Sequence, residues 1–223
     1  MVVGQGTSSP LAAYREDPFL VVLTLGAAGT SIAALLLQLA GIIRMPYTLS
    51  FVTAPGMIFL LCVQIWAGRA GRPLIVNRLR VGFVAGLVGL VAYNGVRWVM
   101  GMALSLSTSP FYSIVIFGGL ITGKPTGSAS AAVAGWLYHI SNGVTFGIMY
   151  TLLAGPARWW FGLLWGAALE LAMLIIYPSS TILHPPALAP FVIVSMTSHA
   201  LFGAVIGLVA QCCAPARSGV SHG

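Results

Sequence analysis

The chain has 223 residues, of which 58% are hydrophobic and only 6% are charged, whereas soluble domains carry about 25% charged residues. This composition excludes an ordinary soluble domain and favours one compact domain embedded in lipid. The net charge of +7 does not indicate nucleic-acid binding, because the ten Lys and Arg residues are scattered between apolar stretches.

Apolar stretches of the length that a membrane-spanning helix needs, about 20 residues, recur along the chain. Asp17 and Pro18 are predicted to cap and start the first of them, and Pro55-Gly56 to kink the second. The predicted spans are 19–43, 48–67, 81–104, 130–153, 159–178 and 190–211.

One further apolar stretch, residues 110–123, is too short to cross a bilayer. It starts with a capping Ser109 followed by Pro110 and ends in glycines, which favours a re-entrant segment or half-helix. The expected fold class is an all-α polytopic membrane protein, with six transmembrane helices plus one short re-entrant or half-helix.

The basic residues in short loops indicate the topology, because such residues are enriched on the cytoplasmic side of a membrane. With 110–123 re-entrant, only Arg44 and Lys124 fall outside. The cytoplasmic side then holds Arg15, Arg69, Arg72, Arg78, Arg80, Arg158 and Arg217.

This topology predicts a multi-pass protein of the inner (cytoplasmic) membrane with both termini in the cytoplasm. Residues 1–18 form a cytoplasmic N-terminal segment, 19–211 a single transmembrane bundle and 212–223 a short cytoplasmic tail. The lipid bilayer is the expected surrounding partner.

Small residues recur every four positions in three of the predicted spans. Residues four apart lie on one helix face, and small residues there let transmembrane helices approach closely. The glycines are therefore predicted to pack helices, and the polar residues among them to face into the bundle. The three stripes are Gly135, His139, Gly143 and Gly147; Ser195, His199, Gly203 and Gly207; and Gly162, Gly166 and Glu170.

Glu170 is the only acidic residue after Asp17, and it stands within an apolar run. At 1.5 Å per residue, it lies about 12–15 Å below one membrane surface, at the depth of both histidines. An ionisable group there costs a few kcal/mol or more unless it is partnered. The sequence therefore predicts one inward-facing polar site, composed of Glu170, His139, His199, Arg97, Asn142, Asn94 and Ser195.

Three functions fit such a site. A channel or transporter for a small ion or solute uses Glu170 to bind a proton or cation, with the histidines lining the path and Arg97 setting the local potential. A structural subunit of a membrane complex, or an oligomer, uses a buried Arg97–Glu170 ion pair to hold helix register. No cofactor is expected in either case.

A third hypothesis is an intramembrane metal- or haem-binding protein or enzyme. His139, His199 and Glu170 form a ligand set suited to a divalent metal, and two histidines at equal depth suit a haem. The three residues lie on different predicted helices, without a local catalytic motif.

The stretch "YHISNGVTFGIMYTLLAGPARWWFGLLWGAALELAMLIIYP", followed by "SHALFG", has a distinctive order of features. A histidine-led helix, a glycine-rich helix ending in proline and a histidine-led last helix make residues 130–207 resemble the YagU-like bacterial inner-membrane proteins. The resemblance implies a helical inner-membrane protein and assigns no functional residue.

Overall fold

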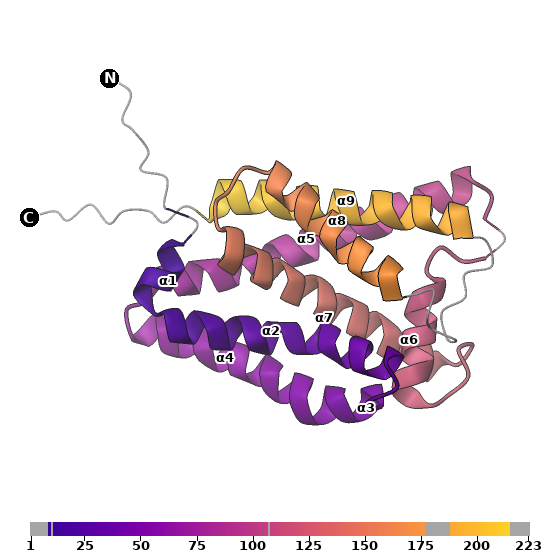
Figure 1. The fold of residues 1–223 in the computed structure, drawn as a ribbon, viewed down its shortest axis with the longest axis horizontal. Coiled ribbons are helices and arrows are strands. Elements are labelled where there is room, and N and C mark those ends of the chain that lie inside the picture. Colours follow the sequence, from indigo (N-terminus) through magenta and orange to yellow (C-terminus); the bar gives the residue numbers. More distant parts are fainter. Residues whose placement is uncertain (1–8, 10, 107, 177–187, 215–223) are drawn as a thin grey trace, which may run out of the picture.

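The computed structural model describes residues 9, 11–106, 108–176 and 188–214, which form helices joined by short turns, without a β-strand in these ranges (Figure 1). The elements are α1 (Ala12–Glu16), α2 (Pro18–Leu39), α3 (Met45–Thr48), the π-helical turn η1 (Leu49–Thr53), α4 (Ala54–Arg69), α5 (Pro73–Ala103), α6 (Tyr112–Thr122), α7 (Ala129–Ala154), α8 (Trp160–Ile176) and α9 (Leu188–Cys213).

Within the described residues, four helical stretches are long and apolar enough to cross a membrane, and two shorter apolar helices accompany them. The predicted all-α class is confirmed, and the chain is a multi-pass membrane protein. Helix α7 is as long as the spans, but its polar residues, among them His139 and Asn142, lower its hydropathy. The four stretches are Pro18–Leu39, Met45–Arg69, Pro73–Ala103 and Ala189–Cys213; the shorter helices are Tyr112–Thr122 and Trp160–Ile175.

Local sequence signals account for the helix starts. The Asp17 carboxylate accepts a hydrogen bond from the Leu20 N–H at 2.9 Å, with Pro18 in the first turn, so the predicted N-cap of α2 is confirmed. An α-helix would press the Pro55 ring against the Phe51 carbonyl. The π-helical turn η1 covers this position and widens the helix there.

Helix α5 begins earlier than the sequence predicts. Its first residue is Pro73, so Arg78 and Arg80 belong to the helix and not to a loop. Glu16 stabilises this start from another helix, because its carboxylate accepts from the Leu74 and Ile75 N–H groups at 3.0 and 3.1 Å. Arg217 and the other residues of the predicted tail beyond Ala214 lie outside the described residues.

Helices α8 and α9 pack with their backbones in direct contact. A Cβ added at Gly162 would overlap the Gly203 carbonyl oxygen, and one at Gly166 would overlap the His199 carbonyl oxygen. Gly207 meets the backbone of Trp159 in the same way. Positions 159, 162 and 166 thus meet 207, 203 and 199 in turn, which fixes an antiparallel register.

The same kind of contact joins α7 to α5 and α6. A Cβ at Gly147 would overlap the Gly82 carbonyl oxygen, and one at Gly143 would overlap the Leu90 side chain. Gly135 faces the Ile114 carbonyl of α6. Helix α6 has only 11 residues and packs against the first turns of α7, at the end of the bundle opposite the described N- and C-terminal helix ends (Figure 1).

Replacing Gly203 by alanine should therefore separate α8 from α9. We expect Gly203→Ala to lower the free energy of unfolding in detergent by about 1–3 kcal/mol, the usual cost of overpacking a core. Gly95→Ala is the matched control, because a Cβ at Gly95 meets nothing within 4 Å. Equal thermal unfolding curves for the two variants would contradict the backbone contact.

Candidate functional site

The register of α8 and α9 brings a buried acid against an imidazole. One turn beyond Gly166, Glu170 is completely buried. Its Oε2 lies 2.8 Å from Nδ1 of His199, whose side chain is 8% exposed. The two side chains form a buried ion pair when the imidazole is protonated.

The position of His199 is held by its own helix. The Nδ1 atom lies 3.0 Å from the Ser195 carbonyl oxygen, and this contact has the geometry of a hydrogen bond. The Glu170 contact has the distance of an ion pair, but neither Glu170 oxygen has a well-directed hydrogen-bond donor among the described residues. The carboxylate is thus desolvated and only partly satisfied, which lowers the stability of the folded protein.

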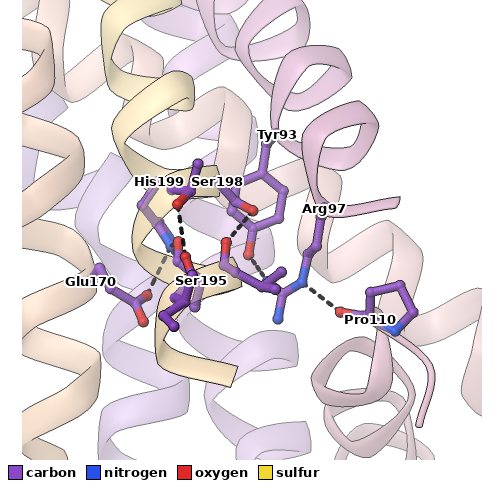
Figure 2. A network of polar contacts seen from close by, with 10 residues as sticks. Tyr93, Arg97, Pro110, Glu170, Ser195, Ser198 and His199 are labelled. Carbon is purple, nitrogen blue, oxygen red and sulfur yellow. Dashed lines mark hydrogen bonds and ion pairs between the residues drawn. The ribbon is translucent and has the colours of Figure 1, made fainter. Parts of the chain in front are cut away.

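Tyr93 connects the pair to the rest of the site. Its ring centroid lies 4.9 Å from that of His199, edge to face, and 5.4 Å from that of His139. Figure 2 shows the row of side chains in which His199 and Tyr93 stand between Glu170 and Arg97. The acid and the guanidinium belong to one network without touching each other.

The guanidinium of Arg97 has hydrogen-bond acceptors other than Glu170. Its guanidinium donates to the Tyr93 hydroxyl, one turn earlier on α5, and to the carbonyl oxygen of Pro110, just before α6 (Figure 2). The hypothesis of an Arg97–Glu170 ion pair is therefore wrong, because these two acceptors hold Arg97 on the other side of Tyr93. Among the described residues, the buried pair is Glu170–His199.

The other predicted polar residues of α7 contact two different helices, His139 contacting α5 and Asn142 contacting α2. His139 Nε2 lies 3.1 Å from Asn94 Oδ1. Asn142 points toward α2, where its Oδ1 accepts from the Ser31 hydroxyl at 2.6 Å. Tyr138 donates to the Ser31 carbonyl oxygen at 3.0 Å, so α2 and α7 are joined by polar contacts.

A cavity of about 50 Å³ lies among these side chains. Such a volume holds a few water molecules, and polar groups within the wall can bind them. Glu170 does not line the cavity, so His199 stands between the cavity and the carboxylate. The polar residues of its wall are Tyr93, Ser113, His139, Asn142 and His199.

The hypothesis of a metal or haem site finds no support in this geometry. Among the described residues, no three His, Cys, Asp or Glu side chains lie close enough to share a metal ion. The Tyr93 ring contacts the imidazoles of both His139 and His199, and the cavity of about 50 Å³ is far too small for a macrocycle.

The predicted packing glycines all lie at helix contacts. At Gly135, Gly143, Gly147, Gly162, Gly166, Gly203 and Gly207, an added Cβ would collide with a neighbouring helix.

Sequence comparison places the chain in a family. Residues 76–220 match DUF6789, which is described as a family of unknown function. The chain belongs to this family. The matched part includes the whole network from Tyr93 to His199, whereas α1 to α4 precede it. The resemblance of residues 130–207 to YagU-like proteins stays a prediction. The chain matches no curated protein and no solved structure.

Sequence reasoning missed Tyr93, the residue that joins the two halves of the network. Its signal was a fourth stripe, on α5, where Gly82, Gly86, Gly89 and Tyr93 lead to Arg97 at steps of three or four. Ser113 was also missed, because α6 carries no charged residue to mark an inward face.

A double-mutant cycle tests whether Glu170 and His199 interact directly. We expect Glu170→Leu and His199→Leu to couple by about 1 kcal/mol or more in unfolding free energy, since contacting residues couple by about 0.5–3 kcal/mol. Glu170→Leu with His139→Leu is the matched control, because Tyr93 contacts both imidazoles but only His199 contacts Glu170. Additive effects for both pairs, measured by reversible unfolding in mixed micelles, would refute the contact.

Proposed function

We propose that this protein is a channel or transporter for a small ion or solute, and that Glu170 is its proton-binding group. The observation that carries the proposal is the position of His199, which lines the cavity and contacts the buried carboxylate with Nδ1. A proton taken up at Nε2 from the cavity can leave Nδ1 for Oε2 of Glu170. The imidazole is neutral again after the transfer, and the carboxylate becomes a carboxylic acid.

We further propose a topology of six spans, in which α2, α3–α4, α5, α7, α8 and α9 each cross the membrane and α6 is a half-helix. The support is that these helices alternate in direction along the bundle, with the shorter α8 crossing it at an angle (Figure 1). The end that holds α1 and the α4–α5 turn, here called the arginine-rich end, carries Arg15, Arg69 and Arg72. The positive-inside rule then places it in the cytoplasm of a bacterial-type inner membrane.

The distribution of space within the bundle supports access from one side. The cavity lies toward α6, whose residues Ser113, Ile114 and Phe117 form part of its wall. On the other side of Glu170, the glycine contacts between α8 and α9 leave no gap between the two backbones. A proton that reaches Glu170 from the α6 end would therefore need a change in the α8–α9 contact to leave toward the arginine-rich end.

The carboxylate makes a direct test possible. In proteoliposomes that contain a pH-sensitive dye, a potassium-valinomycin potential should drive protons through the wild-type protein, and Glu170→Gln should abolish this flux because an amide cannot carry the proton. His199→Gln should also abolish it, since the imidazole is the link to the cavity.

Asp17→Asn is the matched control, because it makes the same carboxylate-to-amide change and asparagine still caps a helix. Variants are compared only after size-exclusion chromatography in detergent shows the same elution profile as the wild-type protein, which controls for misfolding. Unchanged flux in Glu170→Gln would remove the proposed role, and the Glu170–His199 pair would then be a structural contact that holds the register of α8 and α9.

A further inference from the structure

A second hollow lies at the arginine-rich end, away from the Glu170 network. It has a volume of about 430 Å³ and lies where α4 ends and α5 begins. Three small residues, Ala67, Gly68 and Gly71, leave it open, and Gly71 turns the chain with a left-handed φ of 67°. Its basic side chains are Arg72 and Arg80.

Arg80 has an unusual environment for a charged residue. It is exposed, seven residues beyond the start of the candidate span Pro73–Ala103, or roughly 10 Å along the helix. No described residue forms an ion pair or hydrogen bond with its guanidinium. An arginine on the outside of a spanning helix extends toward the headgroup layer, where it finds anionic partners. The hollow lies along this path.

Arg72 supplies a second donor to the same hollow. Its Nη1 donates to the Glu16 carbonyl oxygen at 2.6 Å, which holds the side chain in place. Its Nε is buried and has no hydrogen-bond partner among the described residues. Arg72 immediately precedes α5, and Val76 and Arg80 lie four residues apart on one face of that helix, so the two arginines line the hollow with Val76.

We propose that this hollow binds the phosphate group of an anionic phospholipid in the leaflet at the arginine-rich end, with Arg72 and Arg80 as the donors. A lipid is the expected source of the phosphate, because the hollow lies at the end of a spanning helix and Ala67, Pro73 and Val76 give it apolar walls for the glycerol part. Arginine pairs with phosphate through directed, charge-assisted hydrogen bonds. The proposal does not depend on the function of the Glu170 network.

Lipid titration of the purified full-length protein tests the site. Native mass spectrometry should show that phosphatidylglycerol remains bound when phosphatidylcholine is lost. Arg80→Gln should weaken phosphatidylglycerol binding on the order of five-fold, the factor for one basic residue at a membrane surface. Arg69→Gln is the matched control, because Arg69 is exposed in the same region but does not line the hollow.

A second variant tests the hollow without changing the charge. A Cβ at Gly68 has Val76 Cγ2 as its nearest neighbour, at 4.0 Å, so Gly68→Leu should fill the space and weaken phosphatidylglycerol binding as Arg80→Gln does. If Arg69→Gln and Arg80→Gln weakened phosphatidylglycerol binding equally and Gly68→Leu did not weaken it, the binding would be diffuse attraction to a positive surface and the proposed site would be wrong. Saturable binding of inorganic phosphate that displaces phosphatidylglycerol would overturn the lipid as its occupant, and equal retention of both lipids would overturn the site.

Discussion

The backbone contact between α8 and α9 determines what surrounds the buried acid. At Gly162, Gly166 and Gly203 the two helices lie so close that a methyl group would overlap a carbonyl oxygen of the neighbour. Side-chain packing alone could tolerate several registers of α8 against α9, whereas these backbone contacts fit only one register. Once the register is set, the next turn of α8 must place Glu170 beside His199. The close contact between the glycine faces of α8 and α9 thus brings Glu170 and His199 together.

The contact between Glu170 and His199 leaves the carboxylate without a well-directed hydrogen bond among the described residues. A carboxylate in a low-dielectric interior loses several kcal/mol of hydration, and a stable buried pair recovers it through good geometry and additional hydrogen bonds. Glu170 has the short contact with His199 and no directed donor among the described residues. Arg97 cannot compensate it directly, because Tyr93 and Pro110 already bind its guanidinium.

The two ends of the bundle differ in physical character. Toward α6, imidazole, phenol and hydroxyl groups surround a small cavity. Toward the arginine-rich end, glycine contacts close the interior, and Arg78 is fully buried with Nη1 donating to the Ala214 carbonyl oxygen at 2.7 Å. A cation at the C-terminal end of α9 also interacts favourably with the helix dipole. The bundle therefore combines a half that holds a small cavity lined by polar groups with a closely packed half that ends in positive charge.

Periodicity in the sequence was sufficient to predict much of this arrangement. A run of apolar residues has few options in lipid, because its backbone must satisfy its own hydrogen bonds, so the positions of the helices follow from composition. The steps of four residues that join Gly162 and Gly166 to Glu170 likewise predicted which face of α8 turns inward. The start of α5 was misjudged, because Arg78 and Arg80 look like loop residues until Glu16 is seen to cap the helix from α1.

The choice of partner for Glu170 required the tertiary structure. Arg97 and His199 both lie on inward faces at similar depth, and Coulomb attraction alone favours the arginine. Which of them meets the acid depends on the rotation and register of whole helices, and these are set by backbone contacts between residues distant in the chain. The amino-acid sequence by itself determined that an acid is buried in a helical membrane bundle. Only the packing of α8 against α9, with Tyr93 holding Arg97 apart, decided that its neighbour is an imidazole.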